Sequence, residues 1–148
     1  MSTAATAPRS VSLPRVDALR HDPAAQACLM LRVAFTVAPI LFGLDKFATV
    51  LTDDWTRYLA PELNDLIPGS AATAMDIVGV VEIVAGLVVL LAPRFGGLLV
   101  AAWLGGIIVD LLLRGGYGDI ALRDFGLLIG ALALARLARL TDRTSAAG

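Results

Sequence analysis

Four long apolar stretches, separated by polar connections, dominate the pattern of hydrophobic and polar positions along the chain. They cover residues 28–51, 71–91, 95–113 and 119–140. Each is close to the roughly 20 residues that an α-helix needs to cross a hydrocarbon layer about 30 Å thick. The last is the weakest, because its uncharged run covers only residues 125–135. The pattern predicts an all-α membrane protein, an antiparallel four-transmembrane-helix bundle.

Short turns join the last three stretches. Residues 92–94 (APR) and 114–118 (RGGYG) are too short for anything but a reversal of direction, so the helices that they join are predicted to be antiparallel neighbours. Asp119 follows the second turn, where its carboxylate is predicted to cap the last helix.

The connection at 52–70 is longer and amphipathic. Its large apolar residues recur at helical spacing: Trp55, Tyr58, Leu59, Leu63 and Ile67. This spacing predicts a short helix at the membrane interface, interrupted near Pro61. Ser70 is expected to cap the second apolar helix.

The composition agrees with a membrane protein and excludes several other classes. Of the 148 residues, 57% are hydrophobic and the mean hydropathy is +0.78, whereas soluble domains average about 45–50% apolar residues. The net charge of −1 lacks the basic surplus that a nucleic-acid partner needs. One cysteine, Cys28, and one histidine, His21, exclude an internal disulfide and, in one protomer, paired haem ligands and most zinc sites. We therefore expect no metal and no covalently bound cofactor.

The tails and turns predict the orientation. Residues 1–27 are expected to be a polar, disordered tail, residues 28–140 the transmembrane domain and residues 141–148 a short C-terminal tail. The side that holds both tails has seven arginines and the opposite side has two: Arg9, Arg15, Arg20, Arg94, Arg136, Arg139 and Arg143 against Arg57 and Arg114. The positive-inside rule then places both termini in the cytoplasm. The lipid bilayer is the first expected partner.

Eight ionisable residues lie inside the predicted spans. Each would cost about 2.5–3.5 kcal/mol at the bilayer centre, so such residues normally face the bundle interior and pair. Depth and helical angle predict a polar cluster in the outer half of the bundle, on inward faces that also carry glycines, with these members: Lys46, Asp76, Glu82, Asp110 and Arg123. Asp45, Asp124 and Trp103 are secondary members, the two aspartates toward the outer rim. Arg32 alone lies in the cytoplasmic half, where it can snorkel.

The predicted cluster has more carboxylates than cations. Two positive charges, Lys46 and Arg123, stand against the five carboxylates of Asp45, Asp76, Glu82, Asp110 and Asp124. Because all five cannot stay ionised in a low dielectric, we expect a shared proton or cation there. Glu82 is the deepest and has no cation at its level, so it is the acid expected to be neutral.

Two interpretations of this cluster stay open. In the first, Lys46 and Arg123 pair with Asp76 and Asp110, which fixes the helix register without any ligand. In the second, the cluster lines a pocket for a small molecule or for protons. Trp103 on the same face either fills the core or stacks on a quinone ring. No residue is assigned a catalytic role.

Short motifs in three of the helices resemble those of the DoxX-like membrane proteins. They are GLDKF (43–47), VGVVEIVAGLVVLLAPRFGGLL (78–99) and RDFGLLIGALAL (123–134). The family typically has Gly-x-x-Lys-Phe at the end of the first helix and Gly-x-x-Glu-x-x-x-Gly on the second, followed by an arginine. The matching residues are Gly43, Lys46, Phe47, Gly79, Glu82, Gly86 and Arg94, and the resemblance covers about residues 30–140.

The resemblance implies an accessory or scaffold subunit of a redox-linked or quinone-linked complex of the cytoplasmic membrane. Its partners would be membrane oxidoreductase subunits, its cofactor a quinone, and enzymatic activity of the isolated chain is not expected. The alternative function is binding or transport of a small molecule or of protons through the polar cluster. Two helical hairpins alone bury little surface, so a homo-oligomer is also considered.

Overall fold

The structure, a computed structural model, describes residues 21–61 and 69–146, with side chains through residue 140. These residues form helices and no strand: α2 (Pro23–Ala48), the 3-10 helix η1 (Trp55–Tyr58), α4 (Ala71–Leu91), α5 (Pro93–Arg114) and α6 (Gly118–Ala146). The predicted all-α class is confirmed. Most of the predicted N-terminal tail, and Leu63 and Ile67 of the long connection, lie outside the described residues.

The helix ends follow local capping chemistry. Asp22 accepts a hydrogen bond from the Ala24 N–H at 2.9 Å and Pro23 occupies the first turn, so α2 begins before the predicted residue 28. Ser70 caps α4 as predicted, because its Oγ accepts from the Thr73 N–H at 3.3 Å. The prediction for Asp119 is wrong: α6 begins at Gly118, so Asp119 lies within its first turn.

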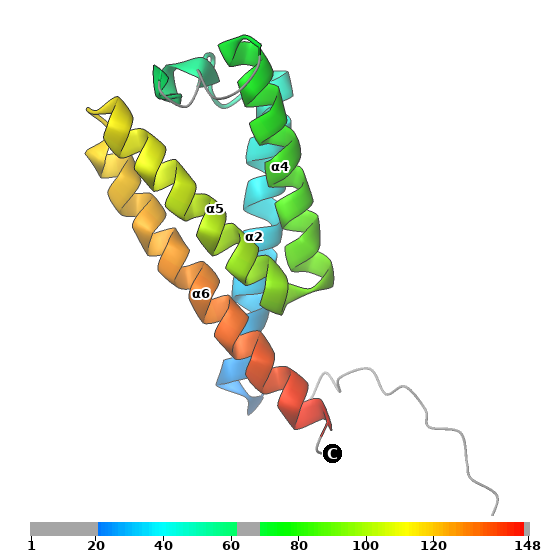
Figure 1. Cartoon of the computed structure of the whole chain (residues 1–148). Coiled ribbons are helices and arrows are strands. Elements are labelled where there is room, and N and C mark those ends of the chain that lie inside the picture. The colour runs from blue at the N-terminus through cyan, green and yellow to red at the C-terminus, as the bar shows by residue number, and fades with distance from the viewer. Residues whose placement is uncertain (1–20, 62–68, 147–148) are drawn as a thin grey trace, which may run out of the picture.

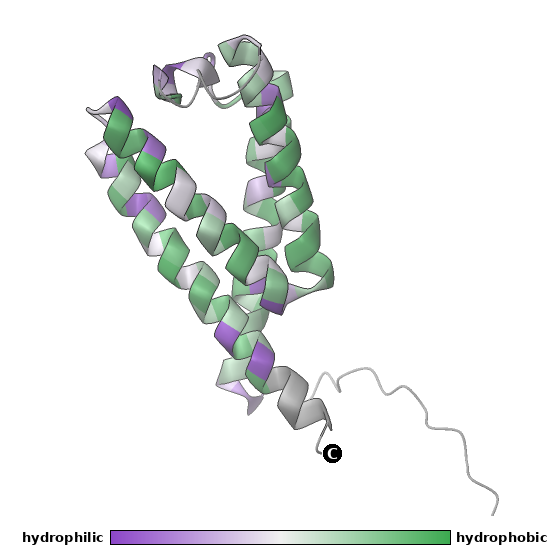
Figure 2. Ribbon diagram, viewed as in Figure 1, coloured by the Kyte–Doolittle hydropathy of each residue, from purple (hydrophilic) through white to green (hydrophobic). Residues whose placement is uncertain are grey.

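Within the described part of the chain, three helices are long and apolar enough to cross a membrane: α2, α4 and α5. Figure 2 shows them as mostly hydrophobic ribbons that a few hydrophilic residues interrupt. The helix α6 is longer still, but charged residues interrupt it near both ends, including Arg123, Asp124, Arg136 and Arg139. Length and composition therefore support at least a multi-pass membrane protein.

The long helices are arranged as two pairs. The helix α2 packs along α4, and α5 packs along α6 (Figure 1). A single residue, Ala92, separates α4 from α5, and Gly96 packs directly on Val89 at this turn. From there α4 and α5 diverge toward their other ends. We call the half of the molecule around the Ala92 turn the closed half, and the half with the diverging ends the open half.

The hydrophobic core lies in the closed half, where all four long helices contribute to it. Its buried members are Cys28, Phe35, Ala85, Val89, Val100, Ala101, Ala131, Leu134 and Ala138. Small residues predominate, which lets helix backbones approach where no hydrophobic force drives association in lipid. Between α5 and α6, a Cβ on Gly97 would lie 2.7 Å from the Ala131 carbonyl oxygen. The closed half is thus fixed by close packing.

The face of α6 that packs inward differs from the predicted one. The prediction put Arg123 on an inward face that also carries glycines. Arg123 is instead exposed and a Cβ on Gly126 would meet nothing within 4 Å, whereas Ala121 and Ala131 are buried. The rotation of α6 about its own axis is therefore set by the packing of its alanines against α5. A charge and a glycine on the same helix face do not predict it.

Candidate functional site

An ion pair between Lys46 on α2 and Glu82 on α4 is the central polar feature of the open half. Lys46 Nζ lies 2.6 Å from Glu82 Oε2, and the side chains are only 4% and 11% exposed. Gly43 and Gly79 lie one turn before these residues, and a Cβ on Gly43 would stand 2.6 Å from the Gly79 carbonyl oxygen. The two glycines bring the backbones close enough for the pair to form in a buried place.

Glu82 therefore has a cation partner, contrary to the sequence-based expectation. That expectation compared the depths of backbone positions, where Lys46 lies nearer the end of its helix than Glu82 does. A lysine carries its charge on a flexible four-carbon stem, so the ammonium group reaches the level of the carboxylate. Glu82 was expected to be the neutral acid because it had no cation at its level. Lys46 supplies that cation, so this reason no longer holds.

Trp55 of η1 covers the ammonium group of Lys46. Lys46 Nζ lies 4.0 Å from the centroid of the Trp55 ring, a cation–π geometry that favours a partly desolvated cation. The ring also meets Phe42 edge-on at 6.3 Å and Tyr58 at 6.0 Å between centroids. The aromatic side chains of the connection between α2 and α4 thus close one side of the ion pair.

Asp45 is buried and organises the same connection. Its carboxylate accepts hydrogen bonds from the N–H groups of Val50, Leu51 and Thr52 at 2.8, 2.7 and 3.2 Å. It also accepts one from Trp55 Nε1 at 3.0 Å. The expectation that Asp45 points to the outer rim is wrong, because four donors from the returning chain hold the carboxylate inward. Asp45 positions the tryptophan that covers its neighbour Lys46.

Asp110 on α5 holds the other end of this connection. Its Oδ1 accepts from the N–H of Ala60, which is fully buried, at 2.8 Å. Residues 50–60 are therefore fastened to α2 through Asp45 and to α5 through Asp110. Asp110 thus lies in the open half, and this hydrogen bond joins it to the backbone of the connection.

Trp103 and Asp124 stand close to Glu82 from α5 and α6. The indole of Trp103 and the charge of Asp124 both act on the Glu82 carboxylate. The Trp103 N–H does not reach hydrogen-bonding geometry, so Nε1 is a buried donor with no partner. Such a donor costs about 1–3 kcal/mol. Asp124 is half-buried, so a second carboxylate contributes to the electrostatic environment of Glu82.

Asp76 and Arg123 do not join this cluster. Asp76 is exposed on α4. Arg123 pairs with Asp119 one turn earlier on α6, at 3.4 Å, with side chains 75% and 67% exposed. The predicted pairing of Lys46 and Arg123 with Asp76 and Asp110 is thus wrong in its partners. The structure brings together Lys46, Glu82, Trp103 and Asp124, with Asp45 and Asp110 holding the connection above them.

Sequence reasoning missed the role of Trp55 in this site. It placed Trp55 at headgroup depth and did not connect it with Lys46. The separation of only ten residues between Asp45 and Trp55 could have indicated their hydrogen bond. A chain that leaves a helix and turns back at once can hydrogen-bond to the last turn of that helix.

Outside the membrane-spanning helices, Asp54 caps η1. The Thr56 hydroxyl donates to its Oδ1 at 2.6 Å and the Thr56 N–H at 2.9 Å. These hydrogen bonds, that of the hydroxyl above all, hold the pKa of Asp54 below its ordinary value. The cap therefore stays charged and ordered at neutral pH.

Neither a metal site nor a known relative identifies the function. Among the side chains of residues 21–61 and 69–140, no group of three or more His, Cys, Asp or Glu residues could hold a metal ion. The chain matches no family model, no curated protein and no solved structure.

Proposed function

We propose that this chain is a four-span integral membrane protein that binds a small hydrogen-bond-accepting molecule in its open half. The observation that supports this proposal is the buried pair of Lys46 and Glu82 beside the unpartnered Nε1 of Trp103. An ion pair that only fixed helix register would not need a buried indole donor beside it that makes no hydrogen bond. A ligand oxygen placed there would satisfy the Trp103 N–H and remove its desolvation cost.

The charge balance favours a ligand or proton over a closed structural pair. Lys46 compensates Glu82, whereas Asp124, whose charge acts on Glu82, is half-buried and forms no salt bridge among the described residues. Like charges in a low dielectric are costly unless a proton or cation is shared. A site with one surplus acid is suited to exchange a proton with the molecule that it binds.

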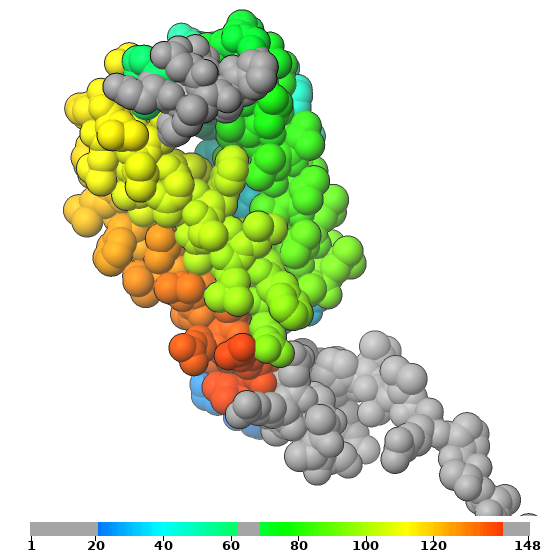
Figure 3. All heavy atoms as spheres, viewed as in Figure 1, coloured from blue at the N-terminus to red at the C-terminus, as the bar shows by residue number. Residues whose placement is uncertain are grey.

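Access to the site is proposed between α4 and α5. The surface is hollowed between these helices in the open half (Figure 3). Neither Gly105 nor Gly106, on the part of α5 next to Trp103, has a side chain, and a Cβ on Gly106 would meet nothing within 4 Å. A flat ligand approaching from the bilayer would meet little steric hindrance there.

A quinone is the ligand class to test first. Its carbonyl oxygens accept hydrogen bonds from donors such as the Trp103 N–H, and it takes up protons when it is reduced. Its partition into the bilayer fits a site inside the spans. This choice rests on the resemblance to DoxX-like proteins, which also leads us to propose that the chain serves a redox-linked membrane complex as an accessory subunit.

The four-span arrangement includes α6 as the fourth span. At 29 residues α6 is long enough to cross the bilayer, and it packs along α5. Its terminal arginines then lie with Arg94 on one side, which the positive-inside rule assigns to the cytoplasm. Both termini would be cytoplasmic and the Lys46–Glu82 site would lie in the outer half of a bacterial cytoplasmic membrane.

The test measures thermal unfolding of the purified full chain in detergent, with and without a short-chain quinone. A free quinone concentration of about 100 times the Kd would raise the free energy of unfolding by about 2.7 kcal/mol. We expect this shift in the wild type and its loss in Trp103→Phe, which keeps the ring and removes the donor. Glu82→Gln and Lys46→Met should lose it as well. Arg123→Gln, an exposed arginine outside the site, is the matched control.

Two results would contradict the proposal. If Trp103→Phe and Glu82→Gln keep the full quinone shift, the ligand does not bind at this site. If the wild type gives no shift with quinone and none between pH 5 and pH 8, the ion pair is structural. A shift that is present only after a partner protein co-purifies would support the accessory-subunit role.

A further inference from the structure

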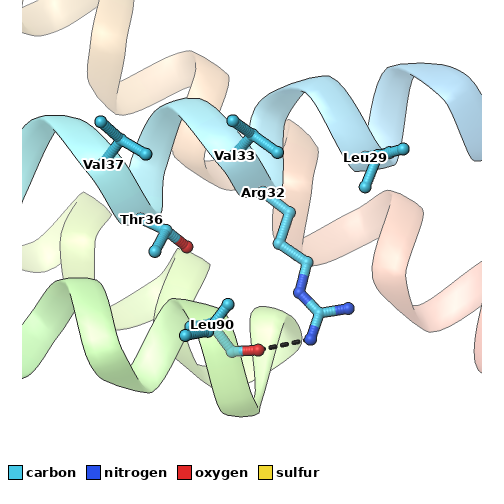
Figure 4. A pocket seen from close by; sticks show the side chains of 6 residues that line it. All are labelled: Leu29, Arg32, Val33, Thr36, Val37 and Leu90. Carbon is cyan, nitrogen blue, oxygen red and sulfur yellow. Dashed lines mark hydrogen bonds between the residues drawn. The ribbon is translucent and has the colours of Figure 1, made fainter.

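A second polar feature lies in the closed half, where Arg32 reaches from α2 to the end of α4. Its Nη2 donates a hydrogen bond to the Leu90 carbonyl oxygen, and its other terminal nitrogen points away from Leu90 (Figure 4). Arg32 Nε is buried and has no partner. No carboxylate among residues 21–61 and 69–140 forms a salt bridge with this arginine.

The bond to Leu90 alone is a helix cap, since cations favour the carbonyls of a last turn. A cap accounts for one of the five N–H groups of a guanidinium. Thr36, one turn along α2, also has a buried hydroxyl without a partner. Two neighbouring side chains thus present unused hydrogen-bonding groups on the same side of α2 (Figure 4).

These polar groups stand at one end of an apolar groove. Arg32 and Thr36 line a hollow of about 290 Å³ together with Leu29, Val33, Val37 and Leu90. Val33 and Val37 also line a second hollow of about 410 Å³, which continues along α2 past Leu41 and Phe42 to Leu51. The two hollows are therefore one groove. Its length from Leu29 to Phe42 is roughly 20 Å, more than one leaflet of a hydrocarbon layer about 30 Å thick.

The polar end of the groove lies at the depth of lipid headgroups. Leu90 is nine residues from the middle of α4, about 13 Å along the axis, close to the edge of the hydrocarbon layer. The closed half also has a surplus of positive charge. Among the described side chains it carries four arginines against one aspartate: Arg32, Arg94, Arg136 and Arg139 against Asp22.

We propose that this groove is a binding site for an anionic phospholipid. The phosphate accepts hydrogen bonds from the free N–H groups of Arg32, and the Thr36 hydroxyl donates to an ester carbonyl. One acyl chain then follows Val33 and Val37 along α2. Basic pockets between helices at the cytoplasmic side bind anionic headgroups in this way. The site is separate from the Lys46–Glu82 site and depends only on the chain being in a membrane.

The test compares two lipids that differ only in headgroup charge. The full chain in detergent is titrated with phosphatidylglycerol or with phosphatidylcholine of the same acyl chains, and bound lipid is counted by native mass spectrometry. We expect at least about tenfold tighter binding of phosphatidylglycerol, the value of one charge-assisted hydrogen bond. Arg32→Gln should abolish the difference, whereas Arg136→Gln, an exposed arginine of the same half, should preserve it.

A second variant keeps the contact between Arg32 and Leu90 intact, because loss of that cap could itself unfold α4. Val37 lies on the exposed face of α2 and lines the apolar part of the groove. Val37→Trp should fill the groove there, and we expect about tenfold weaker binding of phosphatidylglycerol. Equal binding of both lipids by the wild type overturns the proposal. So does an equal loss in Arg136→Gln, unchanged binding in Val37→Trp, or complete displacement of the lipid by inorganic phosphate at millimolar concentration.

Discussion

Lys46 Nζ donates to Glu82 Oε2 across 2.6 Å, and this contact joins the last turn of α2 to the middle of α4. Both groups are buried, so neither charge can be hydrated by bulk water if the other is removed. The pair therefore links the fold of the open half to the proposed site, and mutation separates the two contributions.

Removal of one partner should destabilise the protein more than removal of both. Lys46→Met or Glu82→Leu leaves an uncompensated buried charge, which costs about 3–5 kcal/mol. The double variant should lose less than either single variant, because no unpaired charge remains. Thermal unfolding in detergent measures all three. Arg123→Gln, which breaks an exposed pair, should cost less than about 1 kcal/mol; additive losses in the double variant would contradict a coupled pair.

Asp45→Ala should release the connection after α2. The substitution leaves the N–H groups of Val50, Leu51 and Thr52 without their acceptor and frees Trp55. We expect faster hydrogen exchange at these amides and a red-shifted tryptophan emission, since the Trp55 indole becomes hydrated. Asp53→Ala alters an exposed neighbour and should leave both readouts unchanged. Unaltered exchange in Asp45→Ala would show that the carboxylate does not hold this segment.

The stability of η1 should depend on pH through Asp54. Its pKa lies below the ordinary value of 3.8, chiefly because the Thr56 hydroxyl donates to it. A lowered folded-state pKa means that the contribution is complete above the ordinary value and is lost as the pH falls through the lowered one. An NMR titration of the Asp54 carboxyl should report this pKa. Thr56→Val should raise it toward the ordinary value, whereas Thr52→Val should not.

Gly43→Ala should separate α2 from α4. The added methyl group would stand 2.6 Å from the Gly79 carbonyl oxygen and 2.8 Å from the Ile83 side chain, and overpacking of this kind costs about 1–3 kcal/mol. Gly106→Ala is the matched control, because its methyl group meets nothing within 4 Å. It should be neutral or mildly stabilising through helix propensity. Equal unfolding temperatures for the two variants would mean that the glycine contact is not tight.

Cysteine labelling should establish whether α6 crosses the membrane. In a Cys28→Ala background, Asp119→Cys and Arg139→Cys place single thiols near the two ends of α6. A membrane-impermeant maleimide added to intact cells should label Asp119→Cys alone, and Arg139→Cys only after lysis. Asp53→Cys, in the connection after α2, should behave like Asp119→Cys. Labelling of both α6 positions from one side would reduce the protein to three spans.

The helices were predictable and their contacts were not. Hydropathy identified the second span at its observed bounds, 71–91, because lipid imposes a length on any apolar helix. Depth and helical angle also identified Lys46 and Glu82 as inward-facing. Their pairing escaped prediction because Cα depth ignores the length of a lysine side chain. The prediction that Arg123 faces inward was wrong for another reason. Near a helix end a charged side chain can turn to solvent, so its presence in a span does not prove that it faces inward.

The single residue between α4 and α5 has a mechanical consequence. Gly96 packs on Val89 and Pro93 lies in the first turn of α5, so the two helices meet closely at Ala92. The helix α5 has 22 residues and is about 33 Å long, so a rotation of about 5° moves its far end by about 3 Å. The displacement grows with distance from this pivot, from almost nothing at Ala92 to its largest value at Arg114. A small rotation about Ala92 would thus widen the open half while the closed half stays packed.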